Sequence, residues 1–323
     1  MKIVVLIPCF NEEITIGRVV SDFTRALPEA EIIVFDNNST DLTAQRAREA
    51  GATVYFERRQ GKGYVVLRMF QDIDADVYVM VDGDCTYPAE EVRKLIEPIL
   101  EGRADMVVGS RLHQGSDSDF RLLNRIGNYF FASLFRVIFR SRLTDILSGY
   151  RAFSRPFVRG VPFFGGGFEV EAELTVKALQ GGFQIEEVPV DLSPRPADSK
   201  SKIRIVHDGI VILSTILALV RDYKPLTTFG GLGLLFVTLG LVPGISAIWE
   251  YASTGRLGSR LGAFISLWLG SLGALFIVAG LILHSVSRHF QELTHRLQTI
   301  ERNLSERWDV SKRPVDRTTR NVR

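Results

Sequence analysis

Two aspartates separated by one glycine, Asp82 and Asp84, are the residues of this sequence best suited to chemistry. They follow a short apolar run, residues 78–81, of the kind that forms a buried strand of a parallel sheet. Two carboxylates at one strand end repel each other, and burying them unpaired is costly. A divalent cation would offset the repulsion, and Mg²⁺ or Mn²⁺ commonly shares such oxygens with substrate phosphates. The pattern therefore predicts a metal–diphosphate site, although a strand that ends in an Asp-Gly turn is the simpler alternative.

Aromatic and polar residues also follow the first apolar run, residues 3–7. Proline stops the run at Pro8, and Phe10 has a flat ring on which a nucleotide base could stack. Glu12 could make a polar contact to the same base. The start of a helix explains the segment equally well, with Asn11 as its cap and the glutamate at the positive end of the helix dipole.

A second apolar run ends at Asp36, whose carboxylate could bind a base or a ribose. A glycine–lysine–glycine turn at 61–63 then leads into a helical stretch and suggests a contact from Lys62 to a phosphate. The turn is not a Walker A loop, because Phe56 stands where that loop has its first glycine and Gly63 replaces its Ser or Thr. No G-x-G-x-x-G motif follows the first strand, which disfavours a dinucleotide oxidoreductase.

Basic residues gather in three later segments. Arg111 follows the apolar run 105–109 and is expected at the same sheet edge as Asp84. An apolar helix is expected over 120–142, with its arginines on one stripe, as in a membrane-surface helix or, equally, a core helix with a solvated edge. The stripe consists of Arg121, Arg125, Arg136 and Arg140. The polar loop 194–202 has three cations and two hydroxyls and could hold a phosphate.

Alternating strands and helices must position these groups. The apolar runs are residues 3–7, 31–35, 53–56, 77–81, 105–109 and 185–190. Helical stretches between the first five lie near 13–26, 41–50, 63–73 and 89–101. This alternation predicts βαβ units with right-handed crossovers, and therefore a single α/β domain over residues 1–200. Glu169 and Glu173 share a face near a further helix start, where negative charge is common.

Composition narrows the function classes. The 323 residues carry a net charge of +2, which gives no electrostatic argument for nucleic acid as a partner. The chain begins directly with a strand-like run and lacks the basic start and cleavage site of a signal peptide. Two cysteines, Cys9 and Cys85, make no disulfide framework and are expected to be free thiols in a reducing compartment.

Two later segments, 225–249 and 261–287, contain no Asp, Glu, Lys or Arg. At ~1.5 Å per residue, about 25 residues span ~37 Å, enough for a hydrocarbon core of roughly 30 Å. We predict a transmembrane hairpin over 225–287, because the connecting loop is short. Basic residues flank its outer ends at Arg221 and Arg288, so the positive-inside rule places the catalytic domain and the tail in the cytoplasm.

The segments on either side of the hairpin have their own patterns. Residues 201–224 are expected to form a juxtamembrane amphipathic helix, since the apolar part within them is too short to span. The tail, 288–323, has apolar residues spaced by three and four, which predicts a helix that forms a coiled coil or packs on its own domain. Its end, from about residue 309, is expected to be disordered.

The order and spacing of these motifs resemble family 2 glycosyltransferases with a GT-A fold, in particular the dolichol-phosphate mannose synthase and polyprenyl-phosphate glycosyltransferase group. The resemblance covers nearly the whole chain, including the membrane hairpin. The matching runs are residues 7–12, 36–41, 61–63, 82–84, 109–111, 148–151 and 199–202. It implies a Rossmann-like, mostly parallel sheet in the catalytic domain.

The resemblance also implies roles for individual residues. Those that would bind the nucleotide sugar are Pro8, Phe10, Glu12, Asp36, Lys62, Asp82 and Gly83. Those that would bind the lipid phosphate are Arg111, Arg125, Arg195, Ser201 and Lys202. The catalytic residues would be Asp82, Asp84 and Arg111, and the ligands of Mg²⁺ or Mn²⁺ would be Asp84, Asp82 and Thr86. The chain departs from the family at Thr86, often Gln, at Phe10, usually Tyr, and at Asn37, commonly Asp.

The implied reaction is an inverting transfer from a UDP- or GDP-linked sugar to a polyprenyl phosphate. The acceptor is already an anion at neutral pH, so no strong general base is required. The enzyme has to bring two anions together and stabilise the leaving nucleoside diphosphate. One displacement gives a polyprenyl-phosphate β-sugar from an α-linked donor. The expected location is the cell inner (cytoplasmic) membrane, as a multi-pass protein in contact with the bilayer, and a homo-oligomer is expected.

Two other functions are compatible with parts of the sequence. A processive polysaccharide synthase would use the same fold and donor, but its Q-x-x-R-W motif is incomplete here, because Leu304 precedes Arg307 and Trp308. A non-catalytic membrane scaffold could bind nucleotide sugar without turnover. The sequence leaves open which sugar is transferred, UDP against GDP, and undecaprenyl against dolichyl phosphate.

Overall fold

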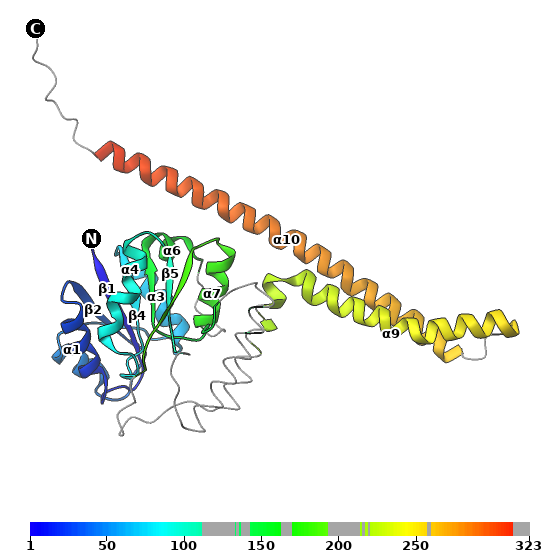
Figure 1. The fold of residues 1–323 in the computed structure, drawn as a ribbon, viewed down its shortest axis with the longest axis horizontal. Coiled ribbons are helices and arrows are strands. Elements are labelled where there is room, and N and C mark those ends of the chain that lie inside the picture. Colours follow the sequence, from blue (N-terminus) through cyan, green and yellow to red (C-terminus); the bar gives the residue numbers. More distant parts are fainter. Residues whose placement is uncertain are drawn as a thin grey trace, which may run out of the picture. The chain divides into compact units, whose positions relative to one another are not determined.

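The computed structural model describes residues 1–111, 143–162, 170–192, 220–256 and 260–312, together with positions 133, 136, 214, 217 and 218. The chain divides into two compact units, Met1–Leu219 and Val220–Arg323 (Figure 1). All strands of the described residues belong to the first unit, and two long helices make up most of the described part of the second.

A seven-stranded sheet forms the centre of the first unit. Its strands are β1 (Ile3–Cys9), β2 (Ala30–Asp36), β3 (Thr53–Phe56), β4 (Val77–Met80), β5 (Met106–Ser110), β6 (Arg151–Ser154) and β7 (Ile185–Pro189). The spatial order is β3-β2-β1-β4-β6-β5-β7, and only β6 runs antiparallel to its neighbours. The predicted mostly parallel α/β sheet is therefore confirmed, and β6 is a strand that the sequence did not predict.

Helices cover both faces of this sheet. They are α1 (Ile16–Ala26), α2 (Thr43–Glu49), α3 (Lys62–Asp72), η1 (Ala89–Glu91), α4 (Val92–Leu100), α6 (Arg155–Gly160) and α7 (Val170–Gln180). Side chains alternate along a strand, so Val5 and Ile7 of β1 pack with α1 and α4, whereas Val4 and Leu6 pack with α3, α6 and α7. Burial on both faces explains why the strands read as continuous apolar runs.

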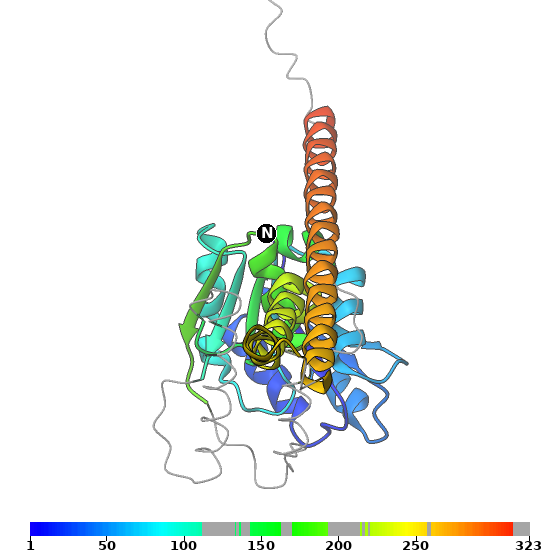
Figure 2. The ribbon, with the colours of Figure 1, turned by 90° about the vertical axis from the view of Figure 1, so that its right-hand side faces the viewer.

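The second unit contains α9 (Pro225–Thr254) and α10 (Arg260–Lys312). By length and composition, Pro225–Thr254 and Arg260–Phe290 are candidate membrane spans. Only 17% and 11% of their most apolar windows are buried within the structure, as expected if lipid covers the rest. Figure 2 shows α10 as one continuous helix. It runs past the predicted span into the tail as far as Lys312, and so includes residues 309–312, for which disorder was expected.

The two long helices touch through glycines. A Cβ on Gly233 would lie 2.6 Å from the carbonyl oxygen of Gly273, and a Cβ on Gly273 would lie 2.6 Å from that of Gly233. A Cβ on Gly240 would likewise lie 3.2 Å from the carbonyl oxygen of Ser266. Small residues allow the backbones of membrane helices to approach closely, and this packing holds α9 against α10.

Replacing Gly233 by alanine should therefore separate the helices and destabilise the hairpin by about 1–3 kcal/mol, the usual range for overpacking. Gly231 is the matched control, since a Cβ there meets no atom within 4 Å. Thermal unfolding of the full-length protein in detergent measures the effect. Equal melting temperatures for Gly233→Ala and Gly231→Ala would show that close packing of the backbones does not stabilise the hairpin.

Candidate active site

The predicted site residues that the structure describes lie at or near the carboxyl edge of the sheet. In the parallel pair of β1 and β2, Cys9 lies opposite Asp36 and Pro8 opposite Phe35. β4 lies on the other side of β1 and leads directly to Asp82. The carboxyl ends of neighbouring parallel strands lie together, so the loops that follow these strands form one surface. This edge is where an open α/β sheet places its ligand.

Hydrogen bonds fasten the loop after β1 to the loop after β2. The Asn11 backbone N–H donates to the Ser39 hydroxyl at 2.9 Å, and the Thr40 backbone N–H donates to Asn11 Oδ1 at 2.8 Å. The Glu12 N–H donates to the Thr43 hydroxyl at 2.8 Å. Asn11 was expected to cap α1; its side chain instead bonds the neighbouring loop, and α1 has Thr15 as N-cap residue. The loops around Phe10, which is 38% exposed, are therefore held in place.

Asp36 has an orphaned buried oxygen at this edge. The residue is 3% exposed, and its Oδ1 has no hydrogen-bond partner among the residues that the structure describes. An unsatisfied buried acceptor is costly, so such an atom calls for a donor from outside the chain. The N–H of a nucleobase or the hydroxyl of a ribose would supply one, and the role of Asp36 in binding the nucleotide stays a prediction.

Asn37 fixes the loop that carries Lys62. Its Nδ2 donates to the carbonyl oxygens of Glu57 at 3.2 Å and Arg59 at 2.7 Å, while its Oδ1 accepts from the Gly61 N–H at 2.7 Å. Only an amide can donate and accept in this way, since an ionised Asp has no N–H. The departure from Asp at this position thus has a structural reason within the loop.

Lys62 bridges two carboxylates. Its Nζ donates to Asp82 Oδ1 at 2.6 Å and to Glu171 Oε1 at 2.5 Å. Burial alone would lower the pKa of the ammonium, but the two negative charges outweigh it and raise that pKa well above the ordinary value. Glu171, 7% exposed near the start of α7, is a site residue that sequence reasoning missed. Glu171 lies 109 positions from Lys62 in the sequence. An acidic residue at a helix start is ordinarily explained by the helix dipole, so it did not indicate a site.

The turn from Asp82 to Asp84 is rigid. The Thr15 hydroxyl donates to the Gly83 carbonyl at 2.7 Å, and a Cβ on Gly83 would lie 2.6 Å from the Cys9 sulfur. Asp84 Oδ1 accepts from the Thr86 backbone N–H at 3.0 Å and from its hydroxyl at 2.5 Å. Cys85, between them, has a left-handed φ of 61°. Such backbone strain is common where a turn positions functional groups.

The carboxylates of this turn fit a divalent cation that takes only some of its ligands from the protein. Among the described residues no group of three or more His, Cys, Asp and Glu side chains could hold a metal. Mg²⁺ typically needs only one or two carboxylates, with water and substrate phosphates completing its shell. Asp82 and Asp84 would supply that donor set. Thr86, predicted as a third ligand, donates its hydroxyl to Asp84 and thereby orients that carboxylate.

A chain of polar contacts fixes Arg111. Its Nε and Nη2 donate to the two oxygens of the fully buried Asp145 at 2.7 and 2.8 Å. Glu187 in turn accepts from the backbone N–H groups of Thr144 and Asp145, at 2.9 and 2.7 Å. Burial would lower the pKa of Arg111, but nearby oxygens, including those of Tyr87, Asp145 and Asp82, raise it. Arg111 therefore stays cationic, within electrostatic reach of Asp82.

The loop before β6 closes the site beside Asp82. Gly149 leaves room for the Asp82 carboxylate, with which a Cβ would collide, and its N–H donates to the Tyr87 hydroxyl at 3.1 Å. Arg151, fully buried, holds the loop by donating to the carbonyls of Ser148 at 2.8 Å and Ile146 at 2.7 Å. Burial lowers the pKa of Arg151 to about 10, so it is still charged at pH 7.

Some predicted residues cannot be placed. The lipid-phosphate positions Arg125, Arg195, Ser201 and Lys202 lie outside the described residues, as do Glu169, most of the segment 120–142 and all of 201–213. Arg136, which is described, is exposed. Cys9 and Cys85 form no disulfide, as predicted.

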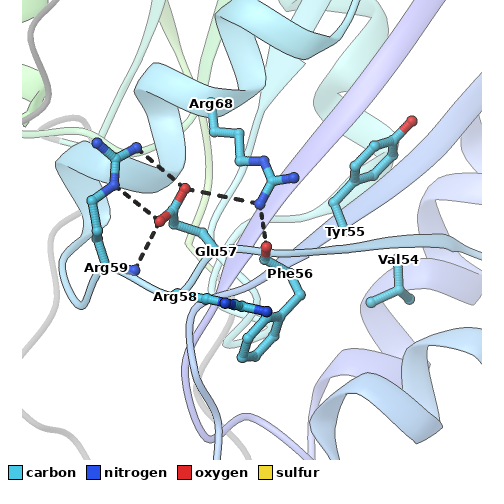
Figure 3. Close-up of a pocket in the computed structure, with 7 residues that line it drawn as sticks. All are labelled: Val54, Tyr55, Phe56, Glu57, Arg58, Arg59 and Arg68. Carbon is cyan, nitrogen blue, oxygen red and sulfur yellow. Dashed lines mark hydrogen bonds and ion pairs between the residues drawn. The ribbon is translucent and has the colours of Figure 1, made fainter.

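An open pocket of about 740 Å³ lies at the end of β3 (Figure 3). It is lined by Val54, Tyr55, Phe56, Glu57, Arg58, Arg59 and Arg68. Figure 3 shows the Glu57 carboxylate between two of the arginines: it accepts from Arg59 Nε at 3.1 Å and pairs with Arg68 at 4.0 Å. None of the predicted site residues lines this pocket. Its ion pairs fix the segment that leads to Lys62.

Comparison with known proteins identifies the class of enzyme to which this fold and site belong. The model of the family described as "Glycosyl transferase family 2" matches residues 4–160 of this chain. Glycosyltransferase AglJ of Haloferax volcanii is 30% identical over 298 residues, 92% of this chain and 97% of the relative. The chain belongs to glycosyl transferase family 2.

Two further similarities extend this result. A dolichyl-phosphate hexose transferase of Haloferax volcanii is 32% identical over 196 residues, 61% of this chain and 85% of the relative. Among solved structures, glucosyl-3-phosphoglycerate synthase of Mycobacterium tuberculosis matches with a TM-score of 0.55 and 25% identity, over 67% of this chain and 80% of that chain. Another structure of that enzyme holds Mn²⁺, UDP and phosphoglyceric acid. The GT-A fold predicted from the sequence is confirmed.

Replacing Gly149 by alanine should displace the Asp82 carboxylate and lower sugar transfer by about 10²-fold, the cost typical of a small misplacement at a reacting centre. Gly17→Ala is the control, because the nearest atom to its added Cβ lies 4.0 Å away. Transfer assays report the effect, and circular dichroism should find both variants folded. Full activity in a folded Gly149→Ala protein would contradict the steric role of this glycine.

Glu57 should make stability depend on acid pH. Its hydrogen bonds to Arg59 outweigh burial and lower the pKa of the carboxyl below the unfolded value of about 4.3. The stabilisation is present above that unfolded value and is lost as the pH falls through the folded pKa. Glu57→Gln should therefore lower the melting temperature at pH 7, and the difference from wild type should shrink as the pH falls through the folded pKa. A pH-independent difference, or an equal one in the exposed control Glu97→Gln, would contradict this.

Proposed function

We propose that this family 2 glycosyltransferase transfers a hexose from a nucleotide sugar to a polyprenyl phosphate, with inversion and with a divalent cation. The observation that carries the proposal is the Asp82–Gly83–Asp84 turn, with Arg111 within its electrostatic reach, in a chain that also has two candidate membrane spans. A dolichyl-phosphate hexose transferase among the relatives supports the lipid acceptor.

The donor would bind along the loops after β1 and β2. Phe10 would stack on the base, and the unpartnered oxygen of Asp36 would accept a hydrogen bond from the base or ribose. Pro8 and Glu12 would complete this part of the site. The hydrogen bonds between the two loops mean that little ordering is needed when the nucleotide binds, which favours affinity.

Asp82 and Asp84 would hold Mg²⁺ or Mn²⁺ together with the donor diphosphate. The bound cation would neutralise negative charge on the leaving nucleoside diphosphate. Thr86 would orient Asp84 for this purpose, and Lys62 would add a fixed positive charge beside Asp82. Mn²⁺ and UDP in a structure of the mycobacterial synthase support a divalent cation for the fold in general.

Arg111 would hold the acceptor phosphate in line with the anomeric carbon. Asp145 fixes two of its nitrogens, so the guanidinium has one orientation. Arg125, Arg195, Ser201 and Lys202 remain predicted partners of the same phosphate. A phosphate oxygen forms the new bond to the anomeric carbon as the bond to the diphosphate breaks, and no proton has to be removed. The nucleoside diphosphate leaves with the electron pair, and the configuration inverts.

The membrane hairpin would bring enzyme and lipid to the same surface. We propose that α9 and α10 cross the inner membrane and that the catalytic unit faces the cytoplasm, since basic residues flank the outer ends of the two spans. The lipid substrate is itself confined to the bilayer, so an anchored enzyme meets it at a high effective concentration.

Asp84→Asn should lower transfer at least about 100-fold, because an amide cannot supply the negative charge that a divalent cation needs. The assay follows radiolabelled sugar from UDP- and GDP-linked donors to a short-chain polyprenyl phosphate, with Mg²⁺ or Mn²⁺. Excess EDTA should stop the wild-type reaction. Asp74→Asn is a suitable control, since Asp74 is an exposed residue that pairs with Arg155 and Arg159.

The product separates this proposal from its alternatives. NMR of the lipid should find a single β-linked sugar. Transfer that continues undiminished in EDTA, or an α-linked product, would contradict the mechanism. Chains of several sugars would point to a processive synthase, and donor binding without turnover to a scaffold.

A further inference from the structure

Lys62 is a cation that the protein itself supplies to the acidic turn. Its ammonium lies between Asp82, at the end of β4, and Glu171, on α7, at 2.6 and 2.5 Å. An ammonium has three N–H donors, and these two contacts use two of them. The side chain is 33% exposed, so the third donor can reach a ligand. The bridge therefore satisfies Asp82 when the site holds no substrate and still presents one N–H to an anion.

The bridge is fixed from both sides. Asn37 holds the loop before Lys62 through contacts to three backbone groups. Glu171 belongs to a helix that is buried on all sides over Val170–Ala178. The other carboxylate of that helix, Glu173, is paired with Lys177 at 2.7 Å. Glu171 is thus the α7 carboxylate assigned to Lys62, and it cannot move away without disturbing a packed helix.

Among the residues that the structure describes, the charge around the turn remains negative in spite of this lysine. Asp82, Asp84 and Glu171 are three carboxylates, whereas Lys62 and the buried Arg151 are two cations. The charge of Arg111 is balanced by Asp145. An anionic diphosphate that approaches this turn is repelled, and its attraction to Lys62 is weakened by the two carboxylates that already bind the ammonium. Addition of a divalent cation makes the net charge of these groups positive, so that the turn attracts the diphosphate.

We propose that Glu171 is a positioning residue that keeps Lys62 paired with Asp82 and thereby makes binding of the nucleoside diphosphate depend on the divalent cation. This inference rests on the proposed function, because it takes the donor diphosphate as the ligand. Without the cation, Lys62 is occupied and the turn repels the nucleotide. With the cation bound, the turn attracts the nucleoside diphosphate, and the third N–H of Lys62 adds a hydrogen bond to it. Coupling between two ligands typically amounts to 5–150-fold in affinity.

The test is the affinity for UDP and GDP, measured by calorimetry on the full chain in detergent, with Mg²⁺ and with EDTA. The nucleotide that wild-type protein binds more tightly is then used for the variants. Glu171→Gln should bind it at least about fivefold more tightly than wild type in EDTA, because one repelling charge is gone and Lys62 is released. The gain in affinity on adding Mg²⁺ should shrink by the same factor.

A second variant gives an effect of opposite sign. Lys62→Met should weaken binding in EDTA below that of wild type, since it removes the only ammonium in the bridge and leaves Asp82 and Glu171 facing each other. Glu173→Gln is the matched control: it removes one buried carboxylate from the same helix, and the ratio of affinities with and without Mg²⁺ should stay at the wild-type value.

Three results would overturn the inference. Glu171→Gln that weakens binding equally with and without Mg²⁺ would indicate a merely structural role. If Glu171→Gln binds with wild-type affinity and its ratio of affinities with and without Mg²⁺ is unchanged, the bridge does not control binding. Wild-type protein that binds neither nucleotide even with Mg²⁺ would refute the proposed function itself, whereas normal metal-dependent binding with an unchanged ratio in Glu171→Gln refutes only the coupling.

Discussion

Concentrated negative charge at the end of β4 is the constraint on which the site depends. Asp82 and Asp84 are fixed there by a turn that Thr15 and Thr86 brace, so the charges cannot separate to relieve their repulsion. Counter-charge must come from neighbouring elements. Lys62 supplies part of it from the start of α3, and a divalent cation with its diphosphate is suited to supply the rest.

The same principle organises the other half of the site. Arg111 at the end of β5 is balanced by Asp145, and the loop of Asp145 is held by Glu187 from β7. Lys62 and Arg111 thus each have a carboxylate partner that fixes their orientation. Preorganised charges of this kind stabilise a transition state better than mobile ones, because no reorganisation is required during the reaction.

Sequence and structure agree where local patterns determine the outcome. Parallel strands buried on both faces read as apolar runs, and their carboxyl ends locate Asp36, Asp82 and Arg111. β6 was missed because it has four residues, begins with Arg151 and runs antiparallel. Glu171, Asp145 and Glu187 were missed as site residues because their partners lie 34–109 positions away in sequence. Only the topology of the sheet brings such pairs together.

The continuity of α10 has a mechanical consequence. Its 53 residues rise over ~80 Å, whereas a hydrocarbon core occupies roughly 30 Å. If the first part of the helix crosses a bilayer, the remainder is a stiff rod that stands tens of ångströms clear of the lipid. A rod of this length sets a fixed reach, so whatever meets its far end is kept at a distance from the headgroups that a flexible linker could not enforce.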